Sequence, residues 1–407
     1  MAAVLVLLSL LFVWSLVSAR LARWSITAPI AFAVAGTVLT SGEHPALSLD
    51  MNTHTFQRII ELVLAVMLFT DATEAIGYER LGRTVGGGRL LGLALPGSII
   101  LAVLFGALLF PGTNWWLLTV AALCVMPIDL APVLMFLRDE RVPLRVRAAL
   151  NIEGGFNDGL ISPLFVFCVA NLVTAEGDTF TDLLVNALKG AGYAVLAGGA
   201  LGLLAAWLVR RCLAGGWATP DELRMASLAL PFLAYAASVL IGGNGFVAAF
   251  VAGLCYARTA YAVGDNNLDL VYDASHLMAL AVWFTFGGLI AKEFAEGIDL
   301  AVFGYALLAL TVARVVPVVA GLTGTRFSWA ERFAVGWLGS RGVTSIVFAV
   351  LAYTQLAGDD AAFVVNVTCA TVLLSVLLHG VTLEPAARRF ARNPRPDVPT
   401  APADSAR

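Results

Sequence analysis

The stretch NIEGGFNDGLISPLF, residues 151–165, places two acids and two amides inside an apolar run that extends over residues 148–173. An apolar run of about 20 residues is long enough for a helix to cross the hydrocarbon core of a membrane. A charge near the bilayer centre costs about 2.5–3.5 kcal/mol on insertion scales and is usually found facing a cavity or an ion path. The stretch therefore predicts a membrane helix that carries a functional site.

Apolar runs of similar length recur on both sides of this helix. Hydrophobic residues make up 59% of the 407 residues and charged residues 13%, whereas a soluble domain has about 25% charged residues. We therefore predict an all-α polytopic membrane protein with about thirteen transmembrane helices. The predicted helices cover residues 4–19, 25–41, 58–77, 90–110, 115–137, 148–173, 182–209, 225–242, 244–260, 272–291, 299–321, 332–355 and 361–384. They form a single transmembrane domain, residues 1–390, followed by a short disordered tail, residues 391–407.

The arginines indicate how the helices are oriented, because positively charged loops stay on the cytoplasmic side of a membrane. They gather in the connections after odd-numbered helices, for example between Arg138 and Arg147. Connections after even-numbered helices carry acids instead, such as Glu176 and Asp359. The N-terminus is therefore expected outside the cell and the C-terminal tail in the cytoplasm.

The chain lacks the sequence patterns of several other functions. Its five cysteines lie far apart without a CxxC spacing, and its four histidines are scattered, so the sequence does not indicate a metal centre. It has no nucleotide-binding loop either. ATP-driven pumping therefore has no support, no cofactor is expected, and we do not expect nucleic-acid binding.

Three ionisable side chains are expected near the middle of the membrane. At about 1.5 Å of rise per residue, Asp158 lies roughly 16 Å beyond the cytoplasmic Arg147, and Asp129 lies roughly 13 Å from Arg138. Arg341 lies at a similar depth on a later helix. Secondary transporters bind their substrates at this depth, on interrupted helices.

The fifth predicted helix carries signals for such an interruption, because CVMPIDLAPVL, residues 124–134, has Pro127 and Pro132 on either side of Asp129. A proline removes the hydrogen bond to the carbonyl four residues earlier. Pro132 therefore frees the carbonyl of Ile128. A free carbonyl at this depth can line a cavity or coordinate a cation.

The twelfth predicted helix has a matching weak point in GWLGSRGV, residues 336–343, where glycines surround Arg341. The fifth and twelfth helices cross the membrane in opposite directions. An inverted repeat would produce this relation. We therefore predict inverted repeats with two interrupted helices that cross near the midplane.

Helical geometry separates the two acids of the sixth predicted helix. At 100° per residue, Glu153 and Asn157 lie about 40° apart, whereas Asp158 lies about 140° from Glu153. Glu153 is placed to pair with an arginine, and Asp158 is free to exchange its partner. Arg341 is interpreted as structural, because a guanidinium keeps its proton, and Arg314 as a structural partner of a carbonyl or an acid.

At these residues the sequence resembles the cation:proton antiporter superfamily, in its bacterial NhaP-like and sodium/hydrogen exchanger branch. The resemblance covers nearly the whole chain and keeps the order of the family's helices. The stretches that carry it are RVPLRVRAALNIEGGFNDGL (141–160), GNGFVAAFVAGL (243–254), ARVVPVV (313–319), GWLGSRGVTSIVFAVLA (336–352) and LLHGVTLEP (377–385).

The resemblance implies roles for particular residues. In the family, the aspartate of an Asn-Asp pair binds cation and proton in turn, which falls here on Asp158, preceded by Asn157. The family's buried ion pair falls on Glu153 and Arg341. An acid that follows a Leu-Phe pair in the third helix falls on Asp71.

The resemblance also shows two departures. The family's Thr-Asp pair on the interrupted helix falls on Ile128 and Asp129, and a family serine falls on Gly154. Two hydroxyl groups that could face the cation are therefore absent. Carbonyl and carboxylate oxygens still suit a hard cation, so the expected ligands are Asp158, Asp129 and the carbonyl of Ile128. Asn157 and Asp71 are also expected to bind cation or proton. The residues expected to support the site are Arg314, Pro127, Pro132 and Gly154.

The function that the resemblance implies is secondary active exchange of a monovalent cation, with sodium as the expected ion, for a proton. Proton and cation would compete for Asp158, and only the occupied site would cross between inward-facing and outward-facing states. Asparagine at position 157, where some relatives have a second acid, implies electroneutral exchange. The resemblance further implies a homodimer in the inner cell membrane, without enzyme activity.

Two alternatives stay open on the sequence. An ion channel or an ion or pH sensor on the same fold could account for the missing hydroxyl groups, because coupling would then be altered or lost. A membrane-embedded enzyme would need a nucleophile or an acid/base pair beyond the residues seen. The sequence also leaves open whether the cation is sodium, lithium or potassium.

Overall fold

The structure, a computed structural model, describes residues 2–22, 27–42, 46–47, 53–80, 86–133, 137, 139, 141–173, 179–263, 265–293, 297 and 299–392. This described part of the chain is helical and contains no strand. Each predicted membrane helix has a helical counterpart at its place in the sequence. Residues 393–407 of the predicted tail lie outside the described residues. Among the described residues, eight helices are long and apolar enough to cross a membrane by length and composition, which confirms a multi-pass membrane protein.

Most of the helices run without a break. They are α1 (Ala2–Ala22), α2 (Ala28–Thr40), α3 (His54–Arg80), α8 (Leu144–Val173), α9 (Phe180–Ala214), α10 (Pro220–Leu240), α11 (Gly245–Val263), α12 (Asp269–Glu293) and α17 (Gly358–Arg392). A short turn, η3 (Asp265–Leu268), precedes α12.

Both predicted interruptions are present. The fifth predicted helix consists of α6 (Trp115–Val125) and, after a non-helical segment, the turn η2 (Ala131–Val133). The twelfth consists of α15 (Trp329–Trp337) and α16 (Val343–Gln355). The breaks fall where the sequence has Pro-Ile-Asp-Leu-Ala-Pro and Gly-Ser-Arg-Gly, because these segments cannot keep a regular helical hydrogen-bond ladder at low cost.

Two further irregularities were not predicted. The fourth helix contains α4 (Gly87–Arg89), a π-helical turn η1 (Leu90–Ala94) and α5 (Leu95–Leu109). Pro96 follows this wider turn, which accommodates the missing amide donor. The eleventh helix bends between α13 (Leu300–Leu310) and α14 (Val312–Gly321). At the bend, the Thr311 hydroxyl donates to the Leu307 carbonyl at 2.6 Å, a contact that often bends helices.

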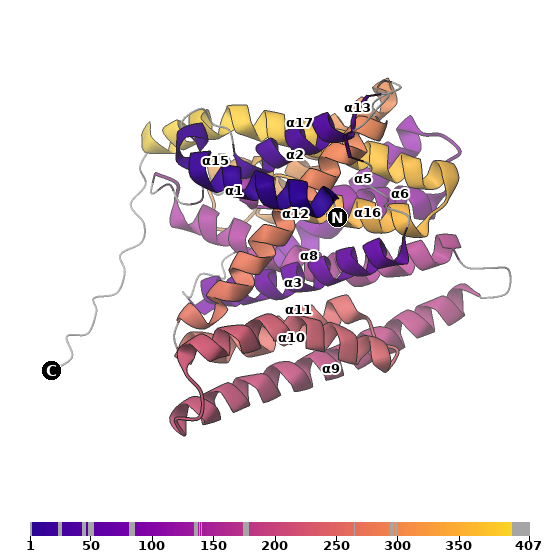
Figure 1. Cartoon of the computed structure of the whole chain (residues 1–407). Coiled ribbons are helices and arrows are strands. Elements are labelled where there is room, and N and C mark those ends of the chain that lie inside the picture. Colours follow the sequence, from indigo (N-terminus) through magenta and orange to yellow (C-terminus); the bar gives the residue numbers. More distant parts are fainter. Residues whose placement is uncertain are drawn as a thin grey trace.

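The helices form two groups that meet at α3 and α8 (Figure 1). On one side, α9, α10 and α11 lie together, and α11 packs against α3. On the other side, the interrupted helices α6 and α15–α16 pack with α5, α13, α14 and α17. Helix α12 runs obliquely across the molecule and packs along α2. The site discussed below lies where the two groups face each other.

Glycines allow the closest helix contacts. A Cβ at Gly198 of α9 would overlap the carbonyl oxygen of Ala248 in α11, and one at Gly202 would lie 2.7 Å from the Ala252 carbonyl oxygen. A Cβ at Gly36 of α2 would likewise overlap a backbone carbonyl of α12. Small residues bring membrane helices together because they let the backbones approach.

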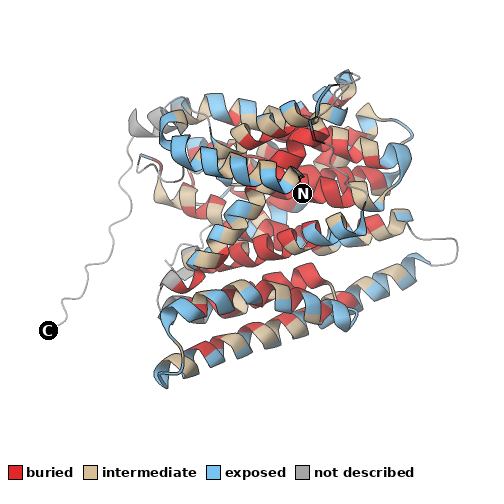
Figure 2. Cartoon of the chain, in the orientation of Figure 1, coloured by how far each residue is buried: buried red, intermediate tan, exposed pale blue. Residues whose placement is uncertain are grey.

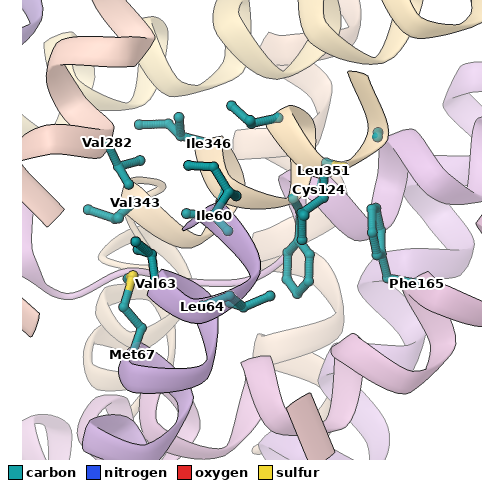
Figure 3. Packing of buried hydrophobic residues seen from close by; sticks show 14 of the residues in the cluster. Ile60, Val63, Leu64, Met67, Cys124, Phe165, Val282, Val343, Ile346 and Leu351 are labelled. Carbon is teal, nitrogen blue, oxygen red and sulfur yellow. The ribbon is translucent and has the colours of Figure 1, made fainter. Parts of the chain in front are cut away.

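The buried residues concentrate in the middle of the molecule, whereas α1 and the outer face of α9 are largely exposed (Figure 2). Exposed apolar side chains on these helices suit a lipid environment. The largest apolar cluster joins α3, α6, α8, α12 and α16 (Figure 3). Labelled members of this cluster in Figure 3 include Ile60, Val63, Leu64, Met67, Cys124, Phe165, Val282, Val343, Ile346 and Leu351.

Candidate ion-binding site

The two interrupted helices meet at their breaks through backbone hydrogen bonds. The Asp129 amide donates to the Ser340 carbonyl at 2.8 Å. In return, the Ser340 hydroxyl donates to the Asp129 carbonyl. The predicted crossing is therefore a direct contact between the two non-helical segments, and it satisfies polar backbone groups that could not face lipid.

The Asp129 carboxylate caps the N-terminus of α16. Its Oδ2 accepts a hydrogen bond from the Val343 amide at 2.6 Å, and its Oδ1 accepts one from the Ala131 amide at 2.8 Å. An anion at a helix N-terminus is favoured, because the first amides of a helix lack partners and carry partial positive charge. The approach is close enough that a Cβ at Gly342 would overlap this carboxylate. Gly342 is therefore needed for contact between the helices.

Arg341 places a positive charge near the C-terminus of α6. Its Nη1 donates to the Pro127 carbonyl at 3.2 Å, just beyond the C-terminus of α6, where a cation is favoured. Its side chain is fully buried. Its backbone amide donates to the Ser375 hydroxyl of α17 at 2.8 Å.

The predicted ion pair between Glu153 and Arg341 is wrong, because Glu153 pairs with Arg314 instead. Both Glu153 oxygens accept hydrogen bonds from the Arg314 guanidinium, one of them at 2.8 Å from Nη2. The two side chains are 0% and 1% exposed. The prediction that Arg314 is the structural partner of a carbonyl or an acid is confirmed. The sequence offered two arginines, Arg314 and Arg341, as partners for Glu153, whereas helix packing directs Arg341 toward the carbonyl of Pro127.

His379 of α17 was not identified from the sequence, although the LLHG stretch was. Its Nε2 lies 2.6 Å from the carbonyl of Trp337, the last residue of α15. Its Nδ1 lies 2.7 Å from the Ser375 carbonyl and 3.1 Å from the Ser375 hydroxyl. A carbonyl only accepts hydrogen bonds, so a ring nitrogen that bonds to it carries a proton. His379 and Ser375 thus hold both ends of the break, since Ser375 also binds the Arg341 amide.

Asn157 and Asp158 of α8 lie against these breaks and are both buried. The Asn157 Nδ2 donates to the Ile128 carbonyl at 3.1 Å, so the carbonyl freed by Pro132 already accepts one hydrogen bond. The Thr344 hydroxyl donates to Asp158 Oδ2 at 2.6 Å. Asn157 Oδ1 and Asp158 Oδ1 have no hydrogen-bond partner among the described residues.

A cavity of about 250 Å³ leads to Asp158. Four acids line it, namely Asp71, Glu74, Asp129 and Asp158. The lining also includes Asn151, Gly154 and Ile128 of the predicted site and, from α12, Tyr272, Ser275 and His276. Glu74 and His276 are exposed, whereas Asp158 is 2% exposed. The cavity therefore connects the buried carboxylate to the protein surface.

The structure thus brings most of the predicted site residues together. Asp71, Asp129, Ile128, Gly154 and Asp158 share one cavity. The residues that the sequence reasoning missed are Thr344, Ser375 and His379, and their common signal was a polar residue within a predicted apolar helix. The model of the family described as "Sodium/hydrogen exchanger, transmembrane" matches residues 3–389. The chain belongs to this family.

Individual relatives agree with this assignment. The K(+)/H(+) antiporter NhaP2 of Shewanella baltica (strain OS223) is 26% identical to this chain over 265 residues, which cover 64% of the chain and 45% of NhaP2. The Na(+)/H(+) antiporter NhaH of Halobacillus dabanensis is 26% identical over 379 residues, which cover 89% of the chain and 91% of NhaH. The match therefore spans less than half of NhaP2 and nearly all of NhaH.

A solved structure shares the fold of this chain. The sodium proton antiporter MjNhaP1 from Methanocaldococcus jannaschii superimposes with a TM-score of 0.76 at 19% sequence identity. The match covers 96% of this chain and 99% of MjNhaP1. The overall arrangement of helices in this chain is therefore that of MjNhaP1.

Proposed function

We propose that this protein moves a monovalent cation across the membrane in exchange for a proton, at a site centred on Asp158. The observation that carries the proposal is the environment of this carboxylate. It is buried at 2% exposure, one of its oxygens lacks a partner among the described residues, and a cavity reaches it. A carboxylate in such a place can take up a proton or a cation without any covalent chemistry.

The charges around the cavity support a cation as the substrate. Four acids line it, and among its described lining residues there is no lysine or arginine. The buried arginines nearby are committed elsewhere, Arg314 to Glu153 and Arg341 to the Pro127 carbonyl. Acids gathered in a cleft with low-dielectric walls raise the local concentration of cations.

Exchange follows from competition for one group. Burial disfavours the charged form of a carboxyl group, and a bound cation favours it. Proton and cation therefore exclude each other at Asp158. If only the occupied, neutralised site can cross the membrane, each gradient drives the other.

The cavity opens toward the side that carries the arginine-rich connections, which we place in the cytoplasm. Its lining comes from the later part of α3 and the early parts of α8 and α12, next to those connections. The apolar cluster of Figure 3, with Ile60, Leu64 and Phe165, lies toward the opposite ends of α3 and α8. It closes the site to the outside. This arrangement corresponds to an inward-facing state with the N-terminus outside.

Asp158 Oδ1 and Asn157 Oδ1 are the proposed primary cation ligands, since both are buried and without partners among the described residues. Asp129 contributes charge to the cavity, but both of its oxygens accept backbone amides, so its main role is to cap α16. Asp71 lines the same cavity and is a further candidate ligand. Because Asn157 cannot carry a proton, one cation exchanges for one proton.

Sodium is the proposed cation, and NhaH and NhaP2 are named for sodium and potassium respectively. We further propose that the protein works as a homodimer in the inner membrane. Positions 154 and 128 of this chain are glycine and isoleucine, which carry no hydroxyl group. Comparing sodium, lithium and potassium is therefore part of the test.

The test is cation-driven proton movement in proteoliposomes with a pH-sensitive dye inside. Asp158→Asn should abolish the response to every cation while leaving the protein folded. Asp360→Asn, at an exposed acid near the start of α17, is the matched control and should respond like the wild type. Cation flux without opposite proton movement would indicate a channel, and substantial exchange by Asp158→Asn would reject the site.

A further inference from the structure

Thr344 lies in the first turn of α16, one residue after the Val343 amide that Asp129 caps. Its side chain is 3% exposed and lines the cavity. Its hydroxyl donates to Asp158 Oδ2 at 2.6 Å. The capped start of α16 thus fixes this hydroxyl beside the carboxylate that is proposed to exchange cation and proton.

The contact leaves the two Asp158 oxygens unequal. Oδ2 accepts the Thr344 hydroxyl, whereas Oδ1 has no partner among the described residues. A hydroxyl has one proton to donate and two lone pairs. Because the proton is used on Oδ2, the lone pairs of Thr344 Oγ1 remain available to a cation that binds the same carboxylate.

Other hydroxyl groups are less well placed in the described part of the site. The chain has isoleucine at position 128 and glycine at position 154, which carry no side-chain oxygen. Thr70 and Ser275 line the cavity, but their hydroxyls bond to each other at 3.2 Å rather than to Asp158. Among the described residues, Thr344 is the one whose side chain forms a hydrogen bond with the Asp158 carboxylate.

We propose that the Thr344 hydroxyl oxygen is a ligand of the transported cation and determines how tightly the site holds small alkali-metal ions. Together with Asp158 Oδ1 and Asn157 Oδ1, it provides the set of neutral and charged oxygens that hard cations prefer. This inference rests on the proposed function, since it assigns a further ligand to the same site.

The experiment measures the KM for sodium, lithium and potassium over a series of pH values in proteoliposomes. Thr344→Val removes the hydroxyl at nearly constant shape, and Thr344→Ser keeps it. Ser345→Ala is the matched control, because it removes a buried hydroxyl one residue further along that has no partner among the described residues. Wild-type and Asp158→Asn proteins are measured in parallel.

Thr344→Val should raise the KM for the preferred cation by about tenfold, the equivalent of one moderate polar contact. The increase should persist at alkaline pH, where protons no longer compete and only direct coordination matters. Thr344→Ser and Ser345→Ala should stay close to wild type. A second readout is the thermal stabilisation of the detergent-solubilised protein by added cation, which should be smaller for Thr344→Val.

A KM of Thr344→Val that converges with the wild type at alkaline pH would overturn the inference, since the hydroxyl would then act only on the carboxylate. An equal loss in Thr344→Ser would also overturn it. If Thr344→Val does not fold, Thr344→Ala with the same binding readout replaces it. Failure of the proposed function is distinct, because Asp158→Asn would then retain exchange whatever Thr344 does.

Discussion

The Asp129 Oδ2 accepts a hydrogen bond from the Val343 amide at 2.6 Å, so the break of one interrupted helix caps the half-helix of the other. The relation is reciprocal, because Arg341 from the second break donates to the Pro127 carbonyl beside the first. Each break thus places a charge of the favourable sign at a helix end of its partner. One of the two groups that hold the crossing together, Asp129, is a residue that the sequence alone would assign to cation binding.

This relationship predicts that Asp129 contributes to stability more than to cation affinity. Asp129→Ala should lower the free energy of unfolding by about 1–2 kcal/mol, because the cap of α16 is lost. Asp129→Asn keeps one acceptor oxygen and should lose less. Thermal unfolding in detergent measures both changes. If Asp129→Asn instead raised the cation KM at unchanged stability, Asp129 would be a ligand after all.

The ion pair between Glu153 and Arg314 predicts a strong coupling between these two positions. Removing either partner leaves a buried charge, which costs about 3–5 kcal/mol. Glu153→Ala and Arg314→Ala should each lower the melting temperature sharply, and the double variant should recover part of the loss. The control is the same double-mutant cycle with Glu153 and Arg341, which should show a weaker coupling energy. Equal coupling in both cycles would contradict the pairing seen in the structure.

His379 is predicted to hold the end of α15 as a hydrogen-bond donor. His379→Gln can still donate to the Trp337 carbonyl, whereas His379→Leu leaves that buried carbonyl unsatisfied at a cost of about 1–3 kcal/mol. We expect His379→Gln to retain exchange and His379→Leu to lose both thermal stability and maximal rate. His54→Leu, at an exposed position, is the control. A His379→Leu protein with wild-type stability and rate would show that the contact is dispensable.

Electroneutral exchange predicts that membrane voltage has no effect. Asp158 would be the only carboxylate that exchanges its partner, because Asn157 cannot ionise. Clamping proteoliposomes with a potassium gradient and valinomycin should leave the sodium-driven pH change unaltered, provided that potassium is not itself transported. An imposed potential that drives or blocks exchange would mean that a second charge moves, and Asp71 would then be the first residue to test.

The pH profile should be bell-shaped for the same reason. At acid pH protons occupy Asp158 and exclude the cation, and at alkaline pH the cation occupies it and no proton is available to exchange. The measurement is the initial rate of exchange over a pH series with equal pH on both sides and an imposed cation gradient. A rate that rises steadily with pH would indicate a separate pH-sensing group.

The sequence by itself determined the membrane fold and the positions of the two helix breaks. Apolar runs gave the order of the helices, because crossing lipid requires both length and low polarity. The prolines beside Asp129 and the glycines beside Arg341 located both breaks, because backbone chemistry decides where a helix cannot continue. The Asn-Asp pair located Asp158.

Only the tertiary structure decided which side chains meet. Glu153 could have paired with Arg341 or Arg314, and the rotation and packing of the helices selected Arg314. Thr344 and His379 are ordinary residues of apolar helices in the sequence, yet folding places them against Asp158 and Trp337. The physical reason is that apolar runs in the sequence set where a helix lies along the chain, whereas direct contact depends on how each helix is rotated about its axis. That rotation depends on all neighbouring helices at once.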